Sequence, residues 1–147
     1  MKTGTTQQTI TLAFINDKSP IVDIICNDLT KLGFEILLRS EHIENGLFQL
    51  SALKELPKVC IIDLDFYDKN VLIELQKLRM KYPSLHLIAH SDIDTEKAVR
   101  ALIEIGFGGY LLIGSDANDF RKAIETVSNG KRYFSMGVYK IAEKHLQ

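Results

Sequence analysis

Hydrophobic positions along the chain follow two alternating patterns. Short runs that are apolar throughout, such as 12–15 and 59–62, are separated by longer stretches in which apolar residues recur at helical spacing. The first pattern is typical of strands buried on both faces, and the second of amphipathic helices. The pattern predicts strands at 10–15, 34–38, 59–64, 85–89 and 110–113, with helices between and after them at about 20–32, 43–56, 69–82, 95–105 and 116–128.

Capping signals mark where the helices begin. Side chains that can accept a hydrogen bond from a first-turn N–H stand just before each helical stretch except the second. The candidates are Ser19, Asp68, Asp94, Ser115 or Asp116, and Ser135 ahead of a further helix in the tail. Strands and helices alternate, and the connections between strands are too short for anything but crossovers, which join parallel strands. The predicted fold class is therefore α/β, with a parallel sheet covered by helices on both faces.

Bulk composition limits the kinds of partner. The chain has 147 residues, 46% of them hydrophobic, and a formal net charge of −1, so neither nucleic acid nor an anionic membrane is an expected direct partner. No secretory signal or membrane-length apolar stretch is present. Cys26 and Cys60 occupy apolar positions without metal-ligand spacing, which predicts reduced, buried thiols and a cytoplasmic location.

Polar residues stand at the carboxyl ends of three of the predicted strands. They are Asn16 and Asp17, Asp63 and Asp65, and His90 and Ser91. Parallel sheets bind ligands outside the carboxyl ends of their strands. If the three strands are neighbours, carboxylates, an amide, an imidazole and a hydroxyl meet at one edge, with Asp63 as the leading candidate site residue.

Each of these side chains also has a purely structural interpretation. Asp63 could terminate a strand and bond loop amides, and Asp17 could cap the first helix. His90 is better explained as a hydrogen-bonded residue at a strand end than as a ligand. Ser91 could be a plain turn residue, and Tyr110 could be static packing.

From about Ile10 to Ser135 the chain resembles the receiver domains of bacterial two-component response regulators, especially those of the LuxR/NarL-type DNA-binding regulators. The resemblance rests on ordered motifs at 15–17, 61–64, Ser91, 109–112 and 129–135. It implies a flavodoxin-like, doubly wound sheet of five strands in the order 2-1-3-4-5. It also implies a receiver domain at 1–135, and a tail at 136–147 that is either a packed helix or the start of a linker to an absent output domain.

The resemblance also implies the chemistry of the site. Asp63 matches the aspartate that accepts a phosphoryl group from a histidine kinase or a small acyl phosphate. Mg²⁺ would be bound by Asp17, Asp63 and the backbone carbonyl of Asp65, and by Asn16 through a water. Ser91 and Tyr110 match the switch pair that responds to phosphorylation, and a homodimer is a possible assembly. Hard oxygen ligands suit Mg²⁺, which spreads the charge of a transferring phosphoryl group.

Two departures from the family pattern bear on this chemistry. Asn16 stands where a second acid is usual, so Mg²⁺ binding is expected to be weak. Ile113 stands where a lysine normally neutralises the phosphoryl group. Lys18 or His90 could replace that lysine.

Three functions follow from these observations. The first is a receiver phosphorylated at Asp63 that regulates transcription through a DNA-binding domain outside this chain. The second is a degenerate receiver that serves as an interaction or dimerisation module without phosphate. The third is a phosphatase, because Asp63-Leu64-Asp65 has the Asp-x-Asp form of haloacid-dehalogenase-like enzymes. That motif belongs on a first strand and lies here on a third, so the chain is not expected to be an enzyme.

Overall fold

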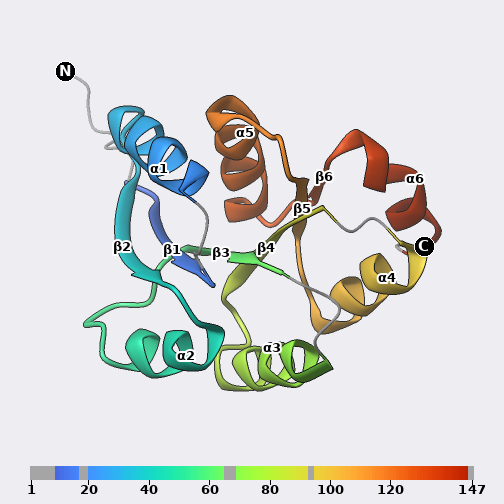
Figure 1. Ribbon diagram of the computed structural model, residues 1–147, viewed down its shortest axis with the longest axis horizontal. Helices are drawn as coiled ribbons and strands as arrows, with labels where there is room; N and C mark the ends of the chain where they lie inside the picture. Colours follow the sequence, from blue (N-terminus) through green and yellow to red (C-terminus); the bar gives the residue numbers. More distant parts are fainter. Residues whose placement is uncertain (1–8, 17–19, 65–68, 93–94, 146–147) are drawn as a thin grey trace.

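A parallel sheet forms the centre of the molecule. The computed structural model describes residues 9–16, 20–64, 69–92 and 95–145. Six strands lie in the order β2-β1-β3-β4-β5-β6, which confirms the predicted order and adds a short edge strand (Figure 1). The strands are β1 (Thr11–Ile15), β2 (Glu35–Ser40), β3 (Val59–Asp63), β4 (His86–Ser91), β5 (Gly109–Leu112) and β6 (Tyr133–Phe134).

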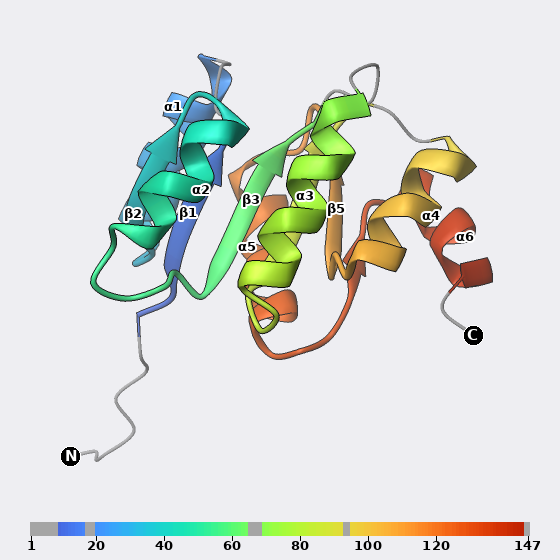
Figure 2. The same ribbon diagram turned by 90° about the horizontal axis from the view of Figure 1, so that it is seen from below.

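Helices cover both faces of the sheet, as expected for a doubly wound fold. They are α1 (Ile21–Lys31), α2 (Ile43–Ser51), α3 (Lys69–Lys81), α4 (Glu96–Ile105), α5 (Ala117–Ser128) and α6 (Met136–His145). Helices α1 and α5 lie on one face, and α2, α3 and α4 lie on the other (Figures 1 and 2). Each face has its own apolar core, because successive strand residues point to opposite sides.

Cys26 and Cys60 are buried cysteines, one in each core. Burial raises the pKa of the Cys60 thiol well above its ordinary value, so this sulfur is held in its unreactive protonated form. None of the helices that the structure describes is long and apolar enough to cross a membrane.

Some predicted boundaries were wrong by a few residues. Helix α2 ends at Ser51 rather than near residue 56, and β4 runs on through His90 to Ser91. Both of these strand-end residues are buried, so the polar pair that the sequence placed after the strand belongs to the strand itself. Sequence periodicity locates such ends poorly because a polar residue can be buried when the fold gives it a partner.

Helix capping also differs from the prediction in one place. The N-cap of α4 is Thr95 and not Asp94; its hydroxyl accepts a hydrogen bond from the Ala98 N–H at 3.3 Å. Asp116, one of the two residues proposed for α5, forms a capping box with Asp119. The proposed caps Ser19, Asp68 and Asp94 lie outside the described residues.

The tail packs on the domain through α6. Val138 and Ala142 are fully buried in the core that α4 shares with the sheet, and α6 lies beside α4 (Figures 1 and 2). Ser135 precedes this helix, as predicted, but its hydroxyl accepts a hydrogen bond from the Leu112 N–H at 3.1 Å. The residue therefore ties the start of α6 to β5.

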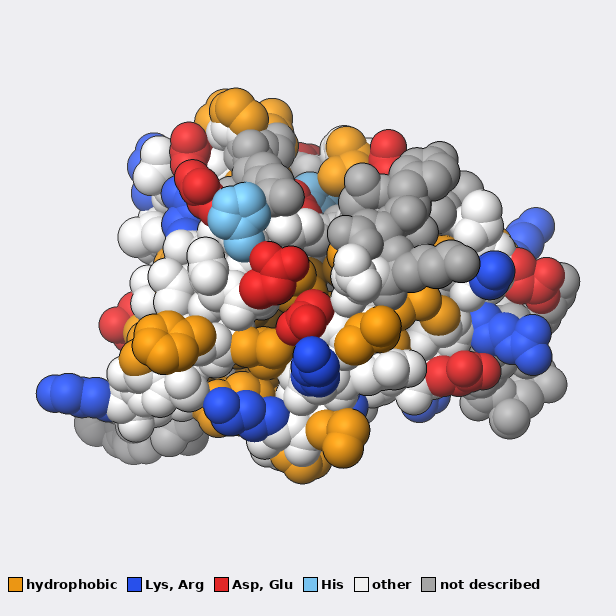
Figure 3. Space-filling model, turned by 60° about the horizontal axis from the view of Figure 1, so that its bottom comes forward, with side chains coloured by type: hydrophobic (Ala, Val, Ile, Leu, Met, Phe, Trp, Pro, Cys, Tyr) orange, Lys and Arg blue, Asp and Glu red, His pale blue; other side chains and the backbone are white. Residues whose placement is uncertain are grey.

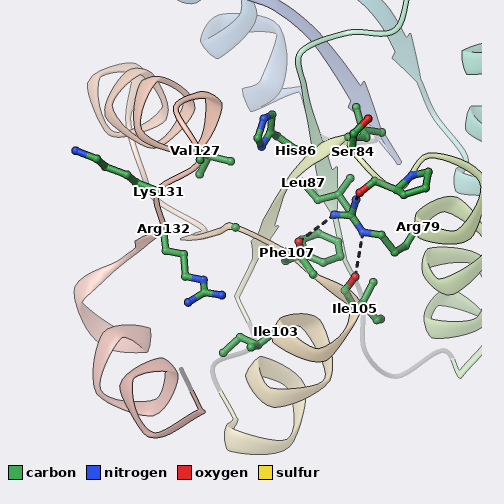
Figure 4. A pocket seen from close by; sticks show the side chains of 15 residues that line it. Arg79, Ser84, His86, Leu87, Ile103, Ile105, Phe107, Val127, Lys131 and Arg132 are labelled. Atoms are coloured by element: carbon green, nitrogen blue, oxygen red, sulfur yellow. Dashed lines mark hydrogen bonds between the residues drawn. The ribbon is translucent and has the colours of Figure 1, made fainter. Parts of the chain in front are cut away.

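A cavity of about 540 Å³ opens at the amino-terminal edge of the sheet, away from the strand ends described below (Figure 4). Arg79 forms one wall, and its guanidinium donates to the carbonyls of Tyr82, Pro83, Ile105 and Gly106. These bonds join the carboxyl ends of α3 and α4. Burial, with the positive charges of Lys58 and Arg79, lowers the pKa of His86 beside it.

The side covered by α2 and α3 has no single continuous apolar patch in the view of Figure 3, where hydrophobic side chains lie between charged ones. These helices carry the exposed apolar residues Phe48, Ile73 and Met80. Apolar side chains scattered in this way are normal on a soluble domain.

Candidate functional site

Three neighbouring strands bring the predicted polar residues to one edge of the sheet. Strand β3 lies between β1 and β4, and Asp63 is the register partner of His90. Asn16 follows β1 with a φ of 62°, and its side-chain N–H donates to the Asp63 carbonyl at 2.8 Å. Asp17 and Asp65, the other predicted metal ligands, lie outside the described residues. The structure therefore confirms that Asn16, Asp63, His90 and Ser91 share this edge.

Asp63 forms a close pair with His90. The distance from His90 Nδ1 to Asp63 Oδ1 is 2.7 Å. The histidine side chain is 2% exposed, whereas the aspartate side chain is 20% exposed. The imidazole packs edge-on against Phe120 of α5, with ring centroids 5.0 Å apart. Asp63 is thus reachable from solvent on one side and held by a buried ring on the other.

Ser91 and Tyr110, the predicted switch residues, point to the opposite face of the sheet. The Ser91 hydroxyl donates to the Leu64 carbonyl at 3.2 Å, one residue beyond Asp63. The Tyr110 side chain is 1% exposed and belongs to the core beneath α2, α3 and α4. The ring of Tyr110 is therefore packed inside the domain.

Ile113, which stands where the resemblance predicts a lysine, lies close to the end of β4. Its backbone N–H donates to the Ser91 carbonyl at 3.1 Å, which holds the residue beside the carboxyl end of β4. Its side chain is 53% exposed and contributes neither charge nor hydrogen-bond donor. Among the side chains that the structure describes, His90 is the basic group paired with Asp63.

The oxygen donors at this edge suit Mg²⁺ in kind. Asp63 offers Oδ1, because the His90 bond uses only one of the two lone pairs on this oxygen, and Asn16 offers its amide oxygen because its amide nitrogen donates to the Asp63 carbonyl. No group of three or more acidic, histidine or cysteine side chains suited to a metal occurs in the described part of the chain. A complete Mg²⁺ site therefore needs Asp17 and the Asp65 carbonyl, which remain predictions.

The sequence alone did not reveal what His90 binds. Its position at a strand end predicted a hydrogen bond, but the partner, Asp63, is 27 residues away in the chain. The signal that could have identified it is register: aligning β3 and β4 by their apolar runs places Asp63 opposite His90.

Comparison with known proteins agrees with this geometry. No family model matches the chain. The transcriptional regulatory protein MctR of Rhizobium johnstonii is 27% identical over 84 residues, which are 57% of this chain and 39% of MctR. The transcriptional regulatory protein DegU of Brevibacillus brevis is 28% identical over 100 residues, which are 68% of this chain and 42% of DegU.

Solved structures give the same result for the fold. A LuxR-family two-component response regulator from Aurantimonas sp. SI85-9A1 superposes with a TM-score of 0.78 at 18% identity, covering 95% of this chain and all of that one. The chain has the receiver fold. The predicted resemblance to the receiver domains of LuxR-type regulators is thereby confirmed. The receiver fold described here spans about two fifths of the length of the curated relatives.

Proposed function

We propose that this chain is the receiver module of a two-component system, and that Asp63 accepts a phosphoryl group from a histidine kinase or a small acyl phosphate. The observation that carries the proposal is the position of Asp63, a partly exposed carboxylate at the carboxyl end of the central strand. Ligands of such sheets bind at this edge. The Ser91 hydroxyl lies at the end of the neighbouring strand, β4. It donates a hydrogen bond to the carbonyl of Leu64, the residue after Asp63.

The reaction is a phosphoryl transfer onto a carboxylate. The free oxygen of Asp63 forms a bond to phosphorus as the bond to the donor's nitrogen or oxygen breaks, and the electron pair of that bond leaves with the donor. Mg²⁺, when bound, spreads the charge on the transferring group. Asn16 stands in place of an acid that would bind Mg²⁺, and Ile113 stands in place of a lysine that would neutralise the phosphoryl group. Phosphoryl transfer is therefore expected to be slow.

The signal would pass through Ser91 and Tyr110 to the side of the domain formed by α4, β5 and α5, on which β6 and α6 pack, and from there to a DNA-binding domain outside this chain. Both curated relatives are transcriptional regulators, which supports this output.

A second candidate function is a degenerate receiver that binds partners, or a second copy of itself, without phosphorylation. Ile113 favours this function, because its exposed side chain offers neither a charge nor a hydrogen-bond donor to a phosphoryl group.

Adding Mg²⁺ with beryllofluoride, a phosphoryl mimic, tests the two functions. NMR signals of Ser91 and Tyr110 are followed in the wild type and in Asp63→Asn, with Asp92→Asn as a matched control because Asp92 is an exposed acid just beyond β4. Weak but saturable shifts in the wild type and in the Asp92 variant, absent in Asp63→Asn, are expected. Shifts that persist in Asp63→Asn would remove Asp63 as the acceptor, and silence in the wild type would favour the degenerate receiver.

Metal affinity provides a separate prediction. Mn²⁺ should broaden the amide signals around Asn16 and Asp63 with an affinity in about the millimolar range, as expected of a site with few protein carboxylates. Asn16→Asp should tighten binding about tenfold by adding a charged ligand. Asn27→Asp, which adds the same charge on the exposed side of α1, is the control. Broadening confined to other surface acids, or equal tightening in both variants, would exclude this metal site.

A further inference from the structure

The bond between His90 and Asp63 joins the proposed acceptor to the interior of the protein. His90 and Asp63 are register neighbours on β4 and β3, so the backbone ladder fixes their separation. The ring is 2% exposed and packs against Phe120, which limits its rotation. Because the fold fixes both residues in this way, it also fixes the short contact of 2.7 Å between His90 Nδ1 and Asp63 Oδ1.

The surroundings of the ring define which nitrogen carries the hydrogen. An ionised carboxylate only accepts hydrogen bonds, so Nδ1 of His90 donates to Oδ1 of Asp63. Nε2 is buried and has no hydrogen-bond partner among the described residues. A hydrogen on Nε2 would be an unsatisfied buried donor, which is costly. The arrangement therefore favours the tautomer with its hydrogen on Nδ1.

Phosphorylation changes the strength of this bond. With Oδ1 held by His90, the other carboxylate oxygen of Asp63 is the one left to bond phosphorus. Once it does, Oδ1 becomes the carbonyl oxygen of an acyl phosphate and no longer shares the negative charge. Hydrogen bonds to a charged acceptor are roughly twice as strong as those between neutral groups. The His90 bond is thus stronger in the unmodified protein than in the phosphorylated one.

We propose that His90 is a positioning residue that stabilises the resting carboxylate of Asp63 and so opposes its phosphorylation. The inference rests on the proposed function, since it describes how the same acceptor is regulated. The role of His90 is independent of the residue at position 113. Ile113 provides no charge to stabilise the phosphorylated form of Asp63, whereas His90 stabilises its unphosphorylated carboxylate.

The hydrogen bond itself is tested in the protein without ligand. Long-range ¹H–¹⁵N spectra should show His90 with its hydrogen on Nδ1 and a downfield Nδ1 proton. Asp63→Ala, which removes the acceptor, should shift that proton upfield or change the tautomer, while Asp92→Ala should leave it unchanged. A His90 spectrum identical in the wild type and Asp63→Ala would overturn the inference.

The regulatory role is tested with Mg²⁺ and beryllofluoride on the full chain. In the wild type, saturation should move the Nδ1 proton upfield because the bond weakens, and this readout needs no variant. His90→Leu, which keeps an apolar side chain in the space but has no donor, should bind beryllofluoride about tenfold more tightly. His90→Asn, whose side-chain N–H falls near the position of Nδ1, should stay close to the wild type.

The outcomes separate this inference from the function on which it rests. Equal or weaker binding by His90→Leu in a folded protein, or a downfield shift of the Nδ1 proton on saturation, would overturn the role of His90 and leave Asp63 as the acceptor. Absence of binding in both the wild type and His90→Leu would overturn the phosphoacceptor function, and with it any regulation by His90.

Discussion

Truncating Ile62 to alanine should lower the free energy of unfolding by about 2 to 5 kcal/mol. Ile62 is fully buried in β3, which lies between β1 and β4, and it contributes to the core beneath α2, α3 and α4. Removing its outer carbons leaves a cavity that neighbouring strands cannot close, because their register is set by backbone hydrogen bonds. Ile61→Ala should cost a similar amount on the opposite face, where it packs in the core of α1 and α5.

Urea titration of these variants is the measurement, and Asp63 is the control on the same strand. Asp63→Asn keeps an acceptor oxygen for His90, so its effect should stay within about 1 kcal/mol. The acids that the sequence places at this edge repel one another, so the sequence alone predicts that Asp63→Ala costs little stability or even adds some. The His90 bond changes that expectation to a loss of about 1 to 3 kcal/mol, since a buried N–H is left without its acceptor. A loss in Asp63→Asn as large as that in Ile62→Ala would identify Asp63 as a structural residue.

Replacing Ile113 by lysine should speed phosphorylation of Asp63 by about tenfold or more. The Ile113 backbone is held by the Ser91 carbonyl at the edge where Asp63 lies, and its side chain is half exposed, so a longer side chain fits without disturbing the core. An ammonium group there would offset part of the two negative charges that the phosphoryl group brings. The measurement is the rate of phosphate incorporation from a small acyl phosphate with Mg²⁺, followed by intact-protein mass.

Ile113→Met is the matched variant for this experiment, because it is long and flexible but carries no charge. It should react at the wild-type rate. Acceleration by both variants would mean that side-chain shape, and not charge, limits the reaction. A fast wild type that gains nothing from Ile113→Lys would show that another group already supplies the charge, and His90 and Lys18 would be the candidates to test next.

The fold was largely determined by local patterns in the sequence. Apolar runs such as 59–62 specify buried strands, and apolar residues at helical spacing specify the helices that cover them. Parallel pairing follows from the short crossovers. The same logic predicts that Asn16, Asp63 and His90 lie at one edge, because the carboxyl ends of parallel strands lie together. The short β6 strand was missed, since two residues carry too little periodicity to be detected.

Tertiary structure decided how the residues of that edge are paired. Asp63 meets the buried ring of His90 and Ser91 meets the Leu64 carbonyl, contacts that each span 27 residues of chain. The direction of each side chain depends on strand register and on the alternation of faces, and a sequence shows neither until the strands are aligned. The spacing of the apolar runs therefore determined that Asp63 lies at the carboxyl edge of the sheet. Only the packing of β4 against β3 decided that His90 holds it there.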